Sequence, residues 1–214
     1  MELKLNIPNS LNEITLGQYQ EFEKLDLTNE SKVHLKMIEI FCNVPEIVAR
    51  NIKATDVAEI CGIINNMFET KHQLINSFKL EGQEYGFIPS LQDMSFGEYI
   101  DLDTFIGDTE NLHRAMNVLY RPIELKQGKR YTLKEYDPES NEIAKDFPLD
   151  AVLGAIVFFY SLGKDLSLTM MNSLDKANQE TLAQHLISHP NTDGTTASLQ
   201  SLTEILQSLN ISAN

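Results

Sequence analysis

Two histidines stand at the spacing that most readily suggests metal chemistry in this chain. His185 and His189 are four positions apart, which would place both imidazole rings on one face of a helix, as in many zinc sites. The acidic residue of an H-E-x-x-H site is absent between them, and Pro190 follows at once and ends a helix. We therefore interpret the pair as exposed histidines at a helix end.

The other reactive residue types show no catalytic or ligand-binding spacing. Cys42 and Cys61 form no CxxC pair and lie in apolar surroundings, which predicts two buried free thiols. The acid-rich stretch 101–110 lacks the glycine and terminal glutamate of an EF-hand in register, so we expect a solvated helix face. There is no glycine-rich phosphate loop, and three histidines are isolated: His34, His72 and His113. We predict a non-enzyme without cofactor or metal.

The charge balance limits the kinds of partner. Among 214 residues, 31 Asp and Glu outweigh 17 Lys and Arg, and the formal net charge is −14. Such a field repels phosphate, which argues against nucleic acid and favours partners with basic or apolar surfaces. No secretion signal opens the chain, and its longest apolar run, Ala151–Tyr160, is far shorter than the roughly 20 residues that cross a bilayer. We expect a soluble protein, made in a reducing cytoplasm, without membrane partners.

A nine-residue pattern occurs twice. Leu11–Tyr19 returns as Leu91–Tyr99 with leucine, glycine and tyrosine identical and the chemistry of the other six positions kept. Each copy follows an Ile-Pro pair and reads as a capping box, in which a hydroxyl and a side chain three positions later cap a helix start. The paired residues are Thr15 with Gln18 and Ser95 with Glu98. The repeat predicts two related helical units.

The first unit, residues 1–80, should be mostly helical. A short strand is expected at 2–7, then a helix from the Thr15 cap that carries Leu16 and Tyr19 on one face. Further helices are expected over 33–41, from Pro45, and from a cap at Thr55 or Asp56. Two strands over 78–88 should meet at a turn at Gly82, and the second should share a small sheet with the N-terminal strand.

The second unit, residues 81–165, should repeat this order with an insertion. Its first helix follows Ser95 and carries Phe96, Tyr99 and Phe105, and its second runs from about Leu112 to Pro122. The insertion, 123–147, contains an expected hairpin around Gln127-Gly128. Pro148 should start a helix that is buried on most sides and ends near Gly163. The fold class is therefore mainly α within an α+β protein, with a small β element and an inserted β-hairpin.

A C-terminal helical extension is expected over 166–214. A long amphipathic helix should run over 166–187, and a polar linker should follow over 190–198. The last segment repeats apolar residues at helical spacing but has too few to fold alone. It would either pack back on the chain or dock on a partner, and its candidate contacts are Leu202, Ile205, Leu206 and Leu209.

The inserted hairpin carries the one local basic cluster in this acidic chain. Its candidate contact residues are Lys126, Lys129, Arg130, Tyr131 and Lys134. Such a basic finger could bind an acidic neighbour, with a protein favoured over nucleic acid. The alternative is a solvated hairpin whose charges keep an exposed sheet edge from aggregating.

Three phrases together resemble a known class of proteins. Tyr85–Pro89, Ser95–Tyr99 and Leu119–Pro122 are similar to segments of small acidic proteins encoded among the structural genes of tailed, crAss-like bacteriophages. The resemblance covers about residues 1–165 and carries no catalytic residues across. It implies a virion component, either internal cargo or a head–tail or tail structural protein, in a multi-copy assembly with other phage structural proteins. The alternatives are a tail assembly chaperone absent from the mature particle and, third, an enzyme. The expected location is the virion, and the host cytoplasm during assembly.

Overall fold

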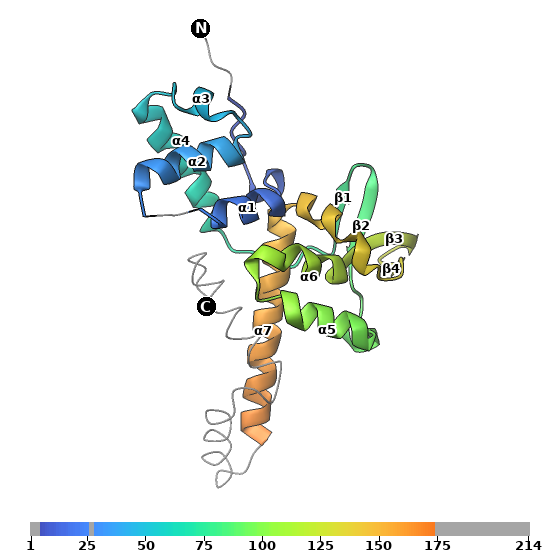
Figure 1. Cartoon of the computed structure of the whole chain (residues 1–214). Coiled ribbons are helices and arrows are strands. Elements are labelled where there is room, and N and C mark those ends of the chain that lie inside the picture. The colour runs from blue at the N-terminus through green and yellow to red at the C-terminus, as the bar shows by residue number, and fades with distance from the viewer. Residues whose placement is uncertain (1–4, 26–27, 174–214) are drawn as a thin grey trace.

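A computed structural model describes residues 5–25 and 28–173 (Figure 1). It combines helices with one antiparallel sheet, so the α+β class is confirmed. The helices are α1 (Leu16–Glu23), α2 (Glu30–Phe41), α3 (Glu46–Ala49), α4 (Ala54–Phe68), α5 (Phe96–Phe105), α6 (Leu112–Leu119) and α7 (Leu149–Ser173). Short 3-10 turns are η1 (Leu11–Glu13), η2 (Leu91–Asp93), η3 (Thr109–Asn111) and η4 (Pro138–Asp146). The strands are β1 (Ser77–Leu80), β2 (Gln83–Phe87), β3 (Tyr120–Gln127) and β4 (Arg130–Leu133).

Helix α7 is the element beside which both halves of the chain lie (Figure 1). Helix α1 packs beside its N-terminal part, and α2, α3 and α4 lie beyond α1. Helices α5 and α6 and the sheet lie on the other side (Figure 1). None of the helices in the described ranges combines the length and apolar character that a membrane crossing needs.

Both predicted capping boxes are present. Thr15 Oγ1 accepts from the Gln18 amide at 3.2 Å, and Gln18 Oε1 accepts from the Thr15 amide at 2.9 Å. Ser95 and Glu98 make the same two bonds at 3.3 and 2.6 Å. A 3-10 turn precedes each helix, η1 before α1 and η2 before α5. The repeated nine residues therefore form the same local structure twice.

The sheet has the order β1-β2-β3-β4, with both predicted hairpins present. Positive φ angles at Glu81, Gly82 and Gly128 form their turns. The predicted pairing of β2 with an N-terminal strand is wrong, because residues 5–7 form no strand and β3 occupies that side. Gly86 leaves room for the neighbouring side chains, because a Cβ there would lie 3.0 Å from Ile123 Cγ1 of β3 and 2.6 Å from the Tyr131 ring of β4.

Three predicted helix boundaries are wrong. Helix α6 ends at Leu119, and Pro122 lies inside β3, where its carbonyl accepts from the Lys134 amide at 2.9 Å. Helix α4 begins at Ala54 without a side-chain cap, so neither Thr55 nor Asp56 caps it. Helix α7 does begin after Pro148 but continues beyond Gly163, because one glycine costs a long helix only about 1 kcal/mol.

One apolar core contains residues from η1 to α7. Its centre is aromatic: the rings of Phe78 and Tyr85 each lie 5.0 Å from that of Phe147, which is fully buried. Along α7, Ala151–Ile156 are buried, whereas residues 157–160 are half-buried and 161–162 are exposed. The predicted burial of this helix is therefore confirmed for its first turns.

Both cysteines are buried free thiols, as predicted, and they should be nearly unreactive in the folded chain. Burial and the neighbouring Cys61 raise the pKa of Cys42 to about 11, and burial raises the pKa of Cys61. At about pH 9 we expect Cys42 to react roughly 50-fold more slowly with an aromatic disulfide reagent than an ordinary thiol. Complete labelling in urea is the control, and rapid labelling in native buffer would contradict the prediction.

Candidate protein-binding surface

Helix α5 presents three large apolar side chains to solvent. Phe96, Tyr99 and Ile100 are 77%, 46% and 45% exposed, and we call these three residues the α5 surface. Positions i, i+3 and i+4 lie on one side of a helix, so their side chains are neighbours. Other exposed large apolar residues of the described chain stand on separate elements: Ile47, Ile63, Leu125 and Leu162. Grouped apolar exposure is typical of protein-binding sites.

A second side of α5 fixes the helix to the rest of the chain. Glu98, Leu102 and Ile106 are buried, and α5 packs on α6. Figure 1 shows α5 at the outside of the molecule, below α6. The helix is therefore apolar on two sides, of which only one is used inside the described chain.

A shielded ion pair holds the first turn of α5. Arg121 Nη1 of β3 lies 2.8 Å from Glu98 Oε1, with only 14% and 8% of the two side chains exposed. The other carboxylate oxygen accepts from the Ser95 amide at 2.6 Å. Within the described residues Arg121 Nε has no acceptor, so Glu98 is the main compensation for this buried cation. The pair joins the start of the helix, which carries Phe96, to the sheet.

Two further contacts hold the middle and the end of α5. The Tyr136 hydroxyl donates to Asp101 Oδ2 at 2.7 Å, and burial followed by this bond raises the pKa of Tyr136. The Arg114 guanidinium lies 3.8 Å from the centre of the Phe105 ring, a favourable cation–π contact. Neither contact uses the α5 surface, which no contact between described residues covers.

The stretch of sequence that contains α5 is acidic. No Lys or Arg occurs between Lys79 and Arg114, whereas the same interval contains Glu81, Glu84, Asp93, Glu98, Asp101, Asp103, Asp108 and Glu110. Glu98 is compensated by Arg121, and Glu84 by Lys126. The surface therefore favours a partner that combines apolar side chains with positive charge.

The predicted basic finger is only partly free. Lys126 pairs with Glu84, and the Tyr131 hydroxyl donates to Phe87 O at 2.7 Å, with Asn76 O at 3.1 Å. Both side chains support the sheet. Lys129, Arg130 and Lys134 are exposed and form no ion pair with the described residues. The contact role of the hairpin stays a prediction, now centred on these three cations. The other predicted contacts, Leu202, Ile205, Leu206 and Leu209, lie outside the described residues.

Sequence reasoning missed the α5 surface. By analogy with Leu16 and Tyr19 of the first copy, Phe96 and Tyr99 counted as part of an ordinary apolar helix pattern. The available signal was that α5 has apolar residues on two sides, more than a helix with one buried face requires.

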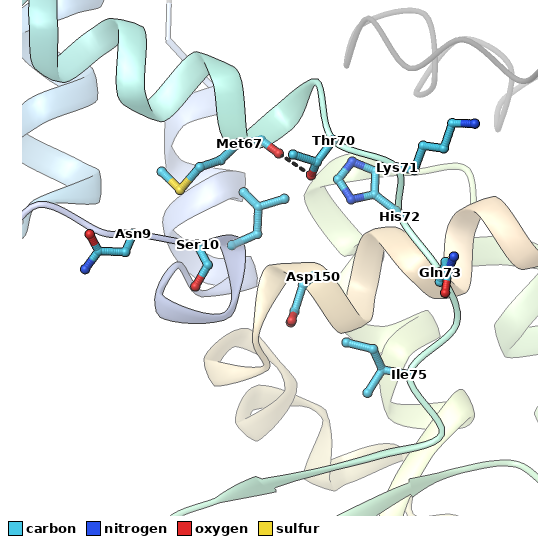
Figure 2. A pocket seen from close by; sticks show the side chains of 10 residues that line it. Asn9, Ser10, Met67, Thr70, Lys71, His72, Gln73, Ile75 and Asp150 are labelled. Atoms are coloured by element: carbon cyan, nitrogen blue, oxygen red, sulfur yellow. Dashed lines mark hydrogen bonds between the residues drawn. The ribbon is translucent and has the colours of Figure 1, made fainter.

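A cavity of about 360 Å³ lies between the end of α4 and the start of α7 (Figure 2). The structure brings His72 and Asp150 to its wall, where burial lowers the pKa of His72 and raises that of Asp150. Its polar groups contact the chain itself: Asp150 Oδ1 accepts from the Ala151 amide at 2.7 Å, and the Thr70 hydroxyl donates to Met67 O at 2.8 Å. In the described part of the chain, no group of three or more His, Cys, Asp or Glu is placed to hold a metal ion. We interpret the cavity as the junction of two helix ends.

Two histidines should make the fold sensitive to mild acid. Burial lowers the pKa of His72 and of His113, although Glu142 lies 3.8 Å from His113. Gln20 Nε2 lies 3.2 Å from His113 Nδ1, a contact that suits an unprotonated nitrogen. Because each histidine has a lower pKa in the folded chain than in the unfolded one, its contribution to stability is complete above about pH 6.5 and is lost as the pH falls. The free energy of unfolding should decrease by at most about 1.4 kcal/mol per histidine and pH unit.

Urea unfolding at about pH 7.5 and about pH 5.5 would measure this loss. The variant with His72→Gln and His113→Gln should show a smaller pH dependence than the parent chain. An unchanged midpoint in the parent chain at the lower pH would contradict the prediction.

Comparison of the chain with protein-family models, with curated proteins and with solved structures finds no match. The strongest feature is the exposed apolar α5 surface, which lies in an acidic stretch of the sequence and on a helix that the shielded Glu98–Arg121 pair holds in place.

Proposed function

We propose that this chain is a non-catalytic component of a tailed-phage particle that acts by binding other proteins. The observation that supports this most is the α5 surface, whose Phe96 is 77% exposed although the helix beneath it is firmly held. A monomer gains nothing by exposing a large ring in this way, whereas a subunit covers it on assembly. The phage assignment rests on the resemblance of Tyr85–Pro89, Ser95–Tyr99 and Leu119–Pro122.

The exposed cations of the hairpin are a second proposed contact. Lys129, Arg130 and Lys134 would bind an acidic neighbour, while the α5 surface binds an apolar and basic one. A chain with two contacts of opposite charge suits a multi-copy assembly among other structural proteins. In this proposal the chain is internal cargo or a head–tail or tail subunit, and needs no cofactor.

The repeat supports a related proposal about origin. Two units, 1–80 and 81–165, would descend from one helical ancestor, with 123–147 inserted in the second and 166–214 added after it. The support is local: both copies form a 3-10 turn, a capping box and a helix. After a duplication, one copy could keep an internal role while the other became a contact.

Quantitative peptide mass spectrometry on purified particles tests the proposal, with the portal protein as the copy-number standard. A fixed ratio to the portal is expected, and a ring multiple would select a connector over loosely packed cargo. Abundance in infected cells together with absence from particles would overturn the virion role in favour of the assembly chaperone.

Incorporation of variants tests the surface itself. The double variant Phe96→Ser with Tyr99→Ser should be lost from particles or strongly depleted. Ile47→Ser is the matched control, because Ile47 is 69% exposed on a separate helix, α3. This variant chain should be incorporated normally. Normal incorporation of the α5 variant would show that this surface is not the contact.

A further inference from the structure

The first copy of the repeated motif already holds a segment of its own chain. The Leu16 amide donates to Phe147 O at 2.9 Å, and the Leu149 amide donates to Ile14 O at 2.8 Å. Between these bonds Thr15 and Pro148 form an isolated antiparallel bridge. Phe147 and Pro148 therefore lie as a short extended step across the start of α1, and Leu149 begins α7.

Side chains complete this docking. Ile14, Leu16, Phe147 and Leu149 are all fully buried. Gly17 permits close packing, because a Cβ there would lie 3.2 Å from Lys145 O and 3.3 Å from Lys145 Cβ. Leu16 and Gly17 are thus both used to receive the segment that ends in Phe147-Pro148-Leu149.

The second copy has the same parts, and no segment of the described residues is docked on them. Phe96 and Tyr99 correspond to Leu16 and Tyr19, and they are exposed rather than buried. A Cβ added at Gly97 would meet no atom within 4 Å, unlike one at Gly17. Within the described chain the amide of Phe96 and the carbonyl of Met94, which correspond to the bonding groups of the first copy, make no hydrogen bond.

The backbone of the second copy is already set for such a bond. Ser95 has φ −67° and ψ 159°, and Thr15 has φ −93° and ψ 156°. Met94 and Ile14 are likewise both extended, with ψ 137° and 135°. Binding would therefore cost little reordering of this strand-like step, which favours affinity.

We propose that the second copy binds an extended segment of a partner protein with the sequence pattern large apolar–Pro–apolar, flanked by Lys or Arg. The pattern is that of Phe147-Pro148-Leu149, whose central proline makes no bond to the motif through its nitrogen and is pre-set for extended backbone. The flanking positive charge follows from the acidic interval between Lys79 and Arg114. This inference rests on the proposed function and names the chemistry of its partner.

The chain's own Phe147-Pro148-Leu149 cannot serve as this partner segment in a second folded copy. It is buried against the first motif, and the helix that follows it begins at Leu149. No other proline in the sequence stands between two apolar residues. The occupant is therefore a segment of another protein, held by two backbone hydrogen bonds and by the apolar contacts of Phe96 and Tyr99.

Fluorescence anisotropy with the full chain and a labelled peptide, Lys-Lys-Phe-Pro-Leu-Lys-Lys, tests the proposal. Saturable binding is expected, and a peptide with serine in place of phenylalanine and leucine should bind at least about 10-fold more weakly at the same charge. Equal binding of the two peptides would overturn the proposal, because charge alone would then explain it.

Variants of Phe96 separate the contribution of its ring to peptide binding from that of its backbone amide. Phe96→Ala removes the ring and keeps the amide donor, and should weaken binding about 10-fold. Phe96→Pro removes the backbone N–H donor as well as the ring. Proline is tolerated at this first helical position because Ser95 before it is extended, and the affinity should fall about a further 5-fold. Ile47→Ala is the control and should bind like the parent chain. Equal affinity of the parent and Phe96→Ala chains would overturn the site.

The outcomes also separate this inference from the proposed function. If Phe96→Ser with Tyr99→Ser is lost from particles but the parent chain does not bind the peptide, the partner chemistry is wrong and the contact role stands. If that variant enters particles normally, the contact role fails whatever the peptide does. Concentration-dependent self-association in sedimentation, abolished by Phe96→Ala, would identify a second copy as the occupant and overturn the partner segment.

Discussion

Replacing Arg121 with methionine should destabilise the chain by about 3–5 kcal/mol, because it leaves the Glu98 carboxylate shielded without its cation. The pair is 2.8 Å apart, and the two side chains are 14% and 8% exposed. Glu98 also caps the Ser95 amide, so it cannot turn to solvent without opening the first turn of α5. Urea unfolding followed by far-UV circular dichroism would measure the loss.

A second substitution should recover much of that stability. In the double variant, Glu98→Gln with Arg121→Met, no unpaired carboxylate remains. The glutamine still supplies an oxygen for the capping box, as Gln18 does in the first copy. Lys126→Met is the matched control, because its partner Glu84 lies in a more exposed pair that should contribute less than about 1 kcal/mol. Equal losses for Arg121→Met and Lys126→Met would contradict this account.

Gly154→Ala should cost about 3 kcal/mol or more, although alanine is the better helix former. A Cβ at this position of α7 would lie 2.2 Å from Gln73 O and 2.8 Å from Gln73 C. These are backbone atoms of the segment between α4 and β1, so no side-chain rotation can relieve the overlap. The helix or the segment has to move, and the core around Phe147 has to repack with it.

Gly62→Ala in α4 is the matched control for Gly154→Ala. A Cβ at Gly62 would meet nothing within 4 Å, so only helix propensity acts and stability should rise by up to about 1 kcal/mol. The prediction is a difference in sign between the two variants in the same unfolding experiment. Destabilisation of equal size in both variants would show that Gly154 of α7 does not lie in close contact with the backbone of Gln73.

For function, the important difference between the two copies is what covers them. Leu16 is fully buried and Phe96 is 77% exposed, yet both follow a capping hydroxyl and a 3-10 turn. One copy therefore shows how the motif receives an extended segment, and in the other no described residue occupies the same groups. The proposed particle contact and its partner chemistry both depend on this comparison.

The sequence alone determined the local structure, because each such feature depends on residues a few positions apart. The Thr15–Gln18 and Ser95–Glu98 capping boxes need only a hydroxyl and a partner three residues later. The two hairpins need strands around a turn that accepts positive φ, and the start of α7 needs Pro148. Cysteines within apolar helical patterns predicted the buried thiols of Cys42 and Cys61.

Only the tertiary structure decided which of these elements meet. The repeat predicted a common local conformation, but the segment 147–149 that covers the first copy is remote in the chain, and no such segment of the described chain covers the second. Three other pairs are also remote in the chain and meet only in the fold: β3 with β2, Arg121 with Glu98, and His72 with Asp150. Long-range packing selects these pairs through the fit of the whole core, which spacing within one segment does not encode. The exposure of Phe96, and with it the candidate site, follows from that packing.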